Sequence, residues 1–207
     1  MNLSKMFYTP VWTGVLDSIT AEQLTDVHSF CIAGRNDSAG KIASNEGGWQ
    51  SKDYDYQQLE DTPLKLVLDV ILDNMNNCMR DLGSPANVRF SNIWININRA
   101  GDSNKLHSHG GVLSGAFYVT APSDSGPIYI SRAFDLENWF YGCIMSQHNT
   151  DASVTEMHLT PSEKMLVLFP SWLPHGVKPH NNSAEERISI SFNTHLDFGG
   201  QREPSTI

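Results

Sequence analysis

The chain has 207 residues, 40% of them hydrophobic, and a formal net charge of −9. This length suits a single domain with one core, and no apolar run approaches the roughly 18 residues of a membrane helix. The acidic balance argues against a protein that holds nucleic-acid phosphate, because that task needs a basic patch. Cys31, Cys78 and Cys143 form no disulfide framework and are expected to be buried thiols. The first residues show no secretory signal, so we expect a cytoplasmic protein without a membrane partner.

Residues 1–87 are predicted to form a strand, two helices and a loop that pack on a barrel. Phe7–Trp12 favours an edge strand, because Pro10 cannot donate to a sheet ladder. Thr20-Ala-Glu-Gln23 fits a capping box and predicts the start of a helix. Residues 34–61 are rich in Gly, Ser, Asn and Asp and are predicted to be loop. Within this loop, Trp49 is either an anchor to the core or a substrate contact.

The clearest predicted helix follows Thr62, which suits the N-cap position, with Pro63 at the first helical position and Gly83 at the end. Its apolar residues recur at helical spacing and are expected to pack on the outside of a sheet. They are Val67, Ile71, Met75, Cys78 and Leu82.

From Val88 onward the hydrophobic period changes to 2, which predicts a β-barrel over residues 88–196. In Ile93–Asn98 the isoleucines share one face, while Trp94, Asn96 and Asn98 share the other. This pattern is expected where one strand face looks into a polar cavity. Asn96 and Asn98 are therefore candidates for co-substrate or substrate contacts. The alternation repeats in Leu113–Val119 and makes Tyr118 a further candidate.

Two segments are predicted to be irregular. Residues 131–155 form a polar and aromatic insertion that either shapes substrate choice or closes one barrel end. Residues 197–207, rich in Gly and Pro, are expected to be a loose tail. Ser123–Pro127 has the composition of a turn.

Three histidines form a candidate metal site. His107 and His109 are one residue apart on an extended segment, so their side chains point to the same side. His175 follows the apolar run Met165–Phe169, which is predicted to be a core strand. Imidazole suits iron, copper, nickel and zinc, and three protein ligands leave coordination positions open. Trp172, three residues before His175, is a candidate substrate contact.

The segment Arg187–Asn193 alternates between polar and apolar residues, which places Arg187 and Ser189 on the face predicted to look into the barrel. An arginine inside a barrel is costly unless it meets an anion. Its planar fork suits a carboxylate, which it can bind by two parallel hydrogen bonds. We therefore expect an anionic co-substrate at Arg187.

The order His-x-His, His and Arg-x-Ser resembles the iron(II)- and 2-oxoglutarate-dependent oxygenases. The similarity extends to a subgroup of such oxygenases in marine bacteria and their phages, and it is carried by Gly47–Ser51, His107–His109, Leu113–Tyr118, Ser125–Pro127, Leu168–Gly176 and Arg187–Asn193. The resemblance implies a mainly β fold with flanking helices. Its core would be a double-stranded β-helix, a jelly roll of the cupin-like barrel type, with an N-terminal helical layer.

The resemblance also implies a reaction and a ligand set. Iron(II) would be bound by His107, His109 and His175, with 2-oxoglutarate and O2 as co-substrates. Arg187, Ser189, Tyr118 and Asn96 would hold 2-oxoglutarate. This co-substrate would be oxidatively decarboxylated to succinate and CO2 while an unknown small-molecule, amino-acid or peptide substrate is hydroxylated. Asn98, Trp172 and Trp49 are the candidate substrate contacts, and a homodimer is left open.

His109 stands where the wider superfamily places Asp or Glu, so Asp102 is an alternative third ligand. Two other hypotheses about the function stay open. A three-histidine cupin-type metalloenzyme fits the histidine spacing, but the glutamate expected soon after the second histidine is absent and Arg187 stays unexplained. A non-catalytic jelly-roll binding or structural module fits the fold alone.

Overall fold

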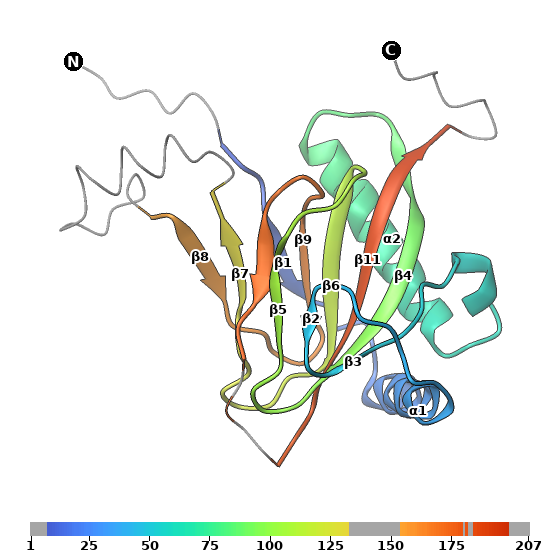
Figure 1. Cartoon of the computed structure of the whole chain (residues 1–207). Helices are drawn as coiled ribbons and strands as arrows, with labels where there is room; N and C mark the ends of the chain where they lie inside the picture. Colours follow the sequence, from blue (N-terminus) through green and yellow to red (C-terminus); the bar gives the residue numbers. More distant parts are fainter. Residues whose placement is uncertain (1–7, 133–153, 180, 182–183, 199–207) are drawn as a thin grey trace.

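The computed structural model describes residues 8–132, 154–179, 181 and 184–198. These residues form two antiparallel sheets that pack face to face (Figure 1). The six-stranded sheet has the order β1-β9-β6-β11-β4-β3, and the five-stranded sheet has the order β2-β5-β10-β7-β8. This arrangement is a jelly roll, and it confirms the fold class predicted from the sequence.

The strands are β1 (Trp12–Val15), β2 (Asn45–Glu46), β3 (Trp49–Gln50), β4 (Asn87–Asn98), β5 (Ser103–His107), β6 (Leu113–Thr120), β7 (Ile128–Ser131), β8 (Glu156–Leu159), β9 (Met165–Pro170), β10 (His175–Val177) and β11 (Arg187–Asp197). The helices are α1 (Ala21–Asp37), the short 3-10 helix η1 (Tyr56–Leu59) and α2 (Leu64–Asp81).

The central pair of the larger sheet, β4 and β11, shows the predicted alternation. Ile95 lies opposite Ile190, and both side chains join the core beneath the helices. Asn96 lies opposite Ser189 and Asn98 opposite Arg187, and these side chains line a cavity between the sheets. One face of each strand therefore builds the core while the other supplies polar groups to the interior.

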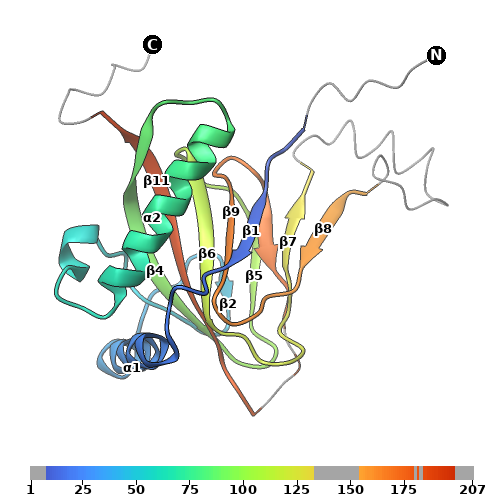
Figure 2. The same ribbon diagram turned by 180° about the vertical axis from the view of Figure 1, so that it is seen from behind.

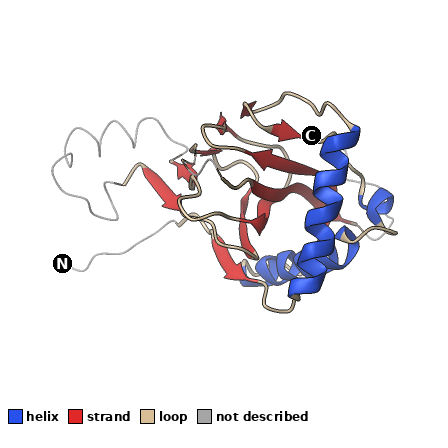
Figure 3. Cartoon of the chain, turned by 90° about the horizontal axis from the view of Figure 1, so that it is seen from below, coloured by secondary structure: helices blue, strands red, loops and turns tan. Residues whose placement is uncertain are grey.

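The helices cover the outer face of the six-stranded sheet (Figures 2 and 3). In α2, Val67, Ile71 and Met75 are fully buried, as their helical spacing predicts. As predicted, Gly83 terminates the helix: it follows the C-cap residue Leu82, has a φ of +75° and donates to the carbonyl of Arg80. Since the next amide, that of Ser84, donates to Met79, this end has the Schellman pattern that favours glycine.

Two details of α2 were predicted wrongly. The N-cap residue is Pro63 instead of Thr62. The Thr62 hydroxyl instead donates a hydrogen bond, at 2.8 Å, to the carbonyl of Leu59, the last residue of η1. Leu82 lies at the C-cap and is 43% exposed, so the buried stripe stops one turn earlier than its spacing suggests.

The first helix, α1, begins with the predicted capping box at Thr20 and Gln23, but it continues to Asp37 and so enters the predicted loop. The rest of residues 34–61 also contains β2, β3 and η1. Strands of two residues have no periodicity of their own and are defined by pairing, here with β5 and β4. The sequence pattern could not reveal them.

The first strand is an edge strand, as predicted, but it spans Trp12–Val15 instead of Phe7–Trp12 and pairs with β9. Directly before β11, Glu186 accepts hydrogen bonds from Arg35 at 2.6 Å and from Arg99 at 2.9 Å. These contacts tie α1 to the beginning of β11.

Cys31 and Cys78 are free and buried, as predicted, and burial raises the pKa of the Cys31 thiol to about 12. Cys143 and most of the predicted insertion and tail lie outside the described residues. No described helix combines the length and apolarity that crossing a membrane requires.

Candidate metal centre

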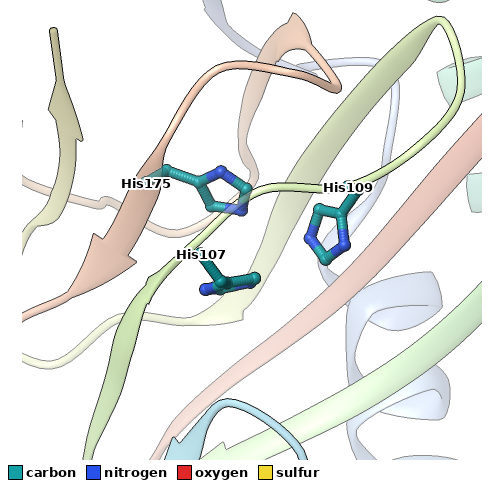
Figure 4. Close-up of side chains that lie close together, drawn as sticks. All are labelled: His107, His109 and His175. Atoms are coloured by element: carbon teal, nitrogen blue, oxygen red, sulfur yellow. The ribbon is translucent and has the colours of Figure 1, made fainter. Parts of the chain in front are cut away.

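Three histidines, from β5, from the loop that follows it and from β10, lie close together (Figure 4) and line the cavity. His107 ends β5 and His175 begins β10, and the two residues lie directly opposite each other in the antiparallel pair. His109 follows in the loop after β5, where its backbone N–H donates to the Ser171 carbonyl at 2.9 Å. The three ring centroids are 4.5 to 5.1 Å apart. The rings are turned toward one common space.

Two of these rings have their tautomer set by the backbone. His107 Nδ1 lies 2.6 Å from the Lys105 carbonyl oxygen, and His175 Nδ1 lies 2.8 Å from that of Leu173. A carbonyl oxygen can only accept, so each Nδ1 carries the proton and donates. Each Nε2 therefore keeps a free lone pair, which is how metal-binding histidines are usually oriented.

The ligand-type atoms of the three histidines lie within 4.8 Å of one another. Metal–nitrogen bonds of about 2.1 Å would hold them about 3.0 to 3.5 Å apart. Three ligand atoms gathered this closely are suited to hold a single divalent ion.

Packing keeps two of the rings neutral and oriented. The Phe169 ring lies 4.5 Å from that of His175, and the Trp94 ring lies 5.7 Å from that of His109, measured between centroids. Burial lowers the pKa of His175 to about 3 and, together with the nearby His107, lowers the pKa of His109 to about 4. Neutral imidazole is the form that binds metals, so both rings are ready for an ion at pH 7.

No carboxylate belongs to this cluster within the described part of the chain. Asp102, the alternative third ligand, instead accepts a hydrogen bond from the Arg99 backbone N–H at 2.6 Å. The donor set is therefore three neutral imidazoles, which suit iron, copper, nickel and zinc and leave the full charge of a divalent ion in place.

The cavity that holds the histidines also contains most of the other predicted site residues. Its lining includes Asn96, Asn98, Tyr118, Arg187 and Ser189. Trp49 does not line it: this side chain packs on the helix-side core and donates to the Ser38 carbonyl at 2.9 Å. Trp172 is not part of the lining either and is 49% exposed, between β9 and β10.

Ser44 and Asn104 line the cavity but were missed from the sequence. Asn104 donates to the Ser44 hydroxyl at 3.1 Å. Asn104 and His107 are three residues apart, so a regular strand would point them to opposite sides. On β10, however, their partners Val177 and His175 are only two residues apart, so β5 contains an extra residue. This bulge turns both side chains toward the cavity, and no period-2 pattern reveals it.

Arg187 is a buried cation with one unused end. It is 1% exposed, its Nη1 donates to the Gly126 carbonyl at 2.7 Å, and its Nη2 has no hydrogen-bond partner. Burial lowers the pKa of Arg187, although Tyr118 and Asp102 act in the opposite direction. Among the described residues, no ion pair includes this arginine. A buried guanidinium without a counter-ion is energetically costly, so this site is suited to bind an anion.

Tyr118 and Asn96 line the same cavity as Arg187. Tyr118 is 2% exposed, and burial raises the pKa of its phenol to about 12, so it stays protonated and can donate a hydrogen bond. Asn96 donates to the Ser191 hydroxyl at 3.0 Å, while its own Oδ1 is buried without a donor. The cavity therefore presents an unpaired donor, Arg187 Nη2, and an unpaired acceptor, Asn96 Oδ1, on the neighbouring strands β11 and β4 of one sheet.

The comparisons with known proteins agree with this geometry. Residues 92–193, which span β4 to β11 and include the three histidines and Arg187, match the model of a family described as "Putative 2OG-Fe(II) oxygenase". A search of curated protein sequences finds no significant match.

Solved structures with the same fold include a prolyl-4-hydroxylase from Pseudomonas putida, at 14% identity and a TM-score of 0.64 over 91% of this chain and 94% of that one. The carbocyclase SnoK of nogalamycin biosynthesis, described as non-heme and alpha-ketoglutarate dependent, has 11% identity and a TM-score of 0.62 over 91% and 80%. HygX from Streptomyces hygroscopicus, solved with nickel, 2-oxoglutarate and hygromycin B, has 10% identity and a TM-score of 0.60 over 92% and 84%. At these identities the likeness establishes the fold.

Proposed function

We propose that this protein is a non-haem iron(II)- and 2-oxoglutarate-dependent oxygenase. The observation that carries the proposal is that a three-histidine cluster and a buried arginine without a counter-ion line the same cavity. The family match over residues 92–193 and the jelly-roll fold support it. In this proposal, 2-oxoglutarate is converted to succinate and CO2 while a second substrate is hydroxylated.

His107, His109 and His175 would hold iron(II), the first and third through Nε2 because Nδ1 is engaged by the backbone. When bound, the iron together with 2-oxoglutarate and O2 supplies the oxidising chemistry. The chain contributes ligands, orientation and a partly closed cavity. His109 replaces the carboxylate of the wider superfamily, so this site would be one charge unit more positive.

Arg187 would bind the carboxylate of 2-oxoglutarate that lies away from the metal, because its Nη2 is the unpaired donor in this cavity. Tyr118 would add a hydrogen bond from its protonated phenol. Ser189, which lies opposite both Asn96 and Tyr118 in the sheet, completes the group of residues proposed to contact the co-substrate.

The second substrate is proposed to be a small molecule, an amino acid or a peptide that reaches the metal from the cytoplasm. Asn98 lines the cavity and is the candidate contact nearest to Arg187 in the sheet. Trp172 and Trp49 lie outside this lining, so a role for either requires a substrate that extends beyond the cavity. A shared fold does not choose among these substrate classes.

A three-histidine cupin-type enzyme is the second candidate, and the absence of a carboxylate from the described histidine cluster favours it. It provides no role for the unpaired end of Arg187. The two candidates therefore differ in one property, which is whether the protein binds 2-oxoglutarate.

The test is thermal unfolding without oxygen, with iron(II), 2-oxoglutarate or both. Ligands that bind only the folded state raise the melting temperature. We expect 2-oxoglutarate to give a further increase when iron(II) is present, followed by succinate formation once oxygen is admitted. An increase with iron(II) alone supports the cupin-type enzyme, and no increase with any metal supports a non-catalytic module.

A further inference from the structure

One amino group of Arg187 is hydrogen-bonded to the protein backbone. Nη1 donates to the Gly126 carbonyl oxygen at 2.7 Å and lies 3.5 Å from that of Lys178, while Nη2 has no partner. The guanidinium is planar and rigid, so holding one amino group determines where the other points. Two backbone carbonyls, one before β7 and one after β10, therefore aim the free end of Arg187.

Gly126 is the residue at which these two backbone segments touch. A Cβ placed on Gly126 would lie 2.6 Å from the carbonyl carbons of Lys178 and Pro179, which is closer than real side chains approach. The Lys178 N–H donates to the Pro127 carbonyl at 3.0 Å across the same contact. Glycine is needed here for space, because only a residue without Cβ lets the backbones approach this closely.

The same contact links the arginine to the candidate metal centre. Lys178 directly follows β10, which begins at His175 and pairs with β7 from Ile130 to Ile128. The short stretch that carries one metal-binding histidine thus also supplies a carbonyl to Arg187. A shift of this backbone would change the direction of the arginine.

We propose that Gly126 is a positioning residue for the co-substrate. By admitting the Lys178 backbone, it brings two carbonyls together on Nη1 and so directs Nη2 at the carboxylate of 2-oxoglutarate. This inference rests on the proposed function, because it takes 2-oxoglutarate as the ligand of Arg187. It gives a role to Gly126 within Ser125–Pro127, a segment whose composition predicts a turn.

The test compares Gly126→Ala with Gly14→Ala by calorimetric titration of the manganese-loaded proteins with 2-oxoglutarate. Gly14 is the matched control, because a Cβ there meets no atom within 4 Å. We expect Gly126→Ala to raise the dissociation constant of 2-oxoglutarate about tenfold, less than the loss of Arg187 itself. The dissociation constant of manganese should stay within about twofold, and Gly14→Ala should change neither constant by more than that, since it touches no site residue.

A double-mutant cycle with Arg187→Lys separates positioning from general damage. If Gly126 acts through the guanidinium, Gly126→Ala should have little further effect on 2-oxoglutarate affinity in the Arg187→Lys background. Equal effects in both backgrounds, or unchanged affinity in the single variant, overturn the inference. If the wild-type protein does not bind 2-oxoglutarate, the proposed function fails and the inference with it.

Pro127→Ala provides a second variant should Gly126→Ala not unfold cooperatively. It adds no atoms but frees the backbone of the turn, because proline restricts both its own φ and the residue before it. We expect a smaller increase, about threefold, in the 2-oxoglutarate dissociation constant, and no increase in the Arg187→Lys background. Unchanged affinity in Pro127→Ala then overturns the inference.

Discussion

His107 and His175 lie opposite each other on the paired strands β5 and β10. The Nδ1 of each ring contacts the backbone carbonyl of the residue two positions earlier in the sequence. The two strands thus position the rings and set their tautomers together. Because both residues lie on paired strands, their Nε2 atoms should keep this arrangement when no metal is bound.

Substituting His175→Ala should weaken metal binding by at least about 100-fold, since even the loss of an outer contact to a ligand costs 10- to 100-fold. The measurement is titration with manganese(II) or cobalt(II). His195→Ala is the control, because His195 is exposed on β11 of the other sheet. If His175→Ala binds metal as the wild type does, the cluster is not the metal site.

The third ligand is tested by comparing His109→Ala with His109→Asp. We expect the alanine variant to lose most metal affinity and the aspartate variant to keep a substantial part of it, because a carboxylate restores the donor type of the wider superfamily. Equal and tight binding by both variants would show that His109 is not a ligand. Asp102→Asn would then test the alternative third ligand.

Arg187→Ala should raise the apparent dissociation constant of 2-oxoglutarate at least about 30-fold, because losing a buried charge contact costs about 2 to 5 kcal/mol. Metal affinity should stay nearly unchanged. Arg187→Lys should restore only part of the affinity, since the ammonium lacks the planar fork in which Nη1 donates to the Gly126 carbonyl while Nη2 stays free for a carboxylate. A wild-type dissociation constant for 2-oxoglutarate in the alanine variant would rule out the proposed role of Arg187.

The metal-free protein should become less stable as the pH falls below about 6.5, the ordinary pKa of histidine. His109 and His175 have folded-state pKa values lowered to about 4 and about 3, so in this range the unfolded chain binds protons that the folded chain does not. Their contribution to stability is fully present above pH 6.5, is lost progressively as the pH falls below that value, and is gone below the folded-state values.

Denaturant unfolding between pH 7 and pH 5 measures this dependence in a window above the usual titration of carboxylates. The double variant His109→Ala, His175→Ala should show a clearly smaller slope over the same window. A metal-free wild type whose stability does not change across it would show that these two rings are not protected from protonation.

The sequence was most informative where a regular pattern continued over many residues. The alternation in β4 and β11 predicted which side chains enter the cavity, and the helical spacing predicted the buried face of α2 apart from Leu82. It was least informative where pairing with a distant segment defines the element, as in β2 and β3, or where a competing hydrogen bond intervenes, as at Thr62.

The candidate site shows the same division. His107, His109, His175 and Arg187 were predicted as site residues because their residue types and order have a chemical meaning, and the structure places them in one cavity. Ser44 and Asn104 were missed because their orientation depends on an irregular strand. The role proposed for Gly126 was also invisible, because it depends on the distance between two backbones that are far apart in sequence.

The bulge in β5 makes the candidate site more sensitive to changes of chain length than to many substitutions. A regular strand cannot turn Asn104 and His107 to the same side, and one extra residue between them achieves this. Deleting a single residue from Lys105–Leu106 would remove that irregularity and turn Asn104 out of the cavity, even though every functional side chain remained in the sequence. A homologue with a gap at this point should therefore be expected to have a differently built cavity, however well its histidines align.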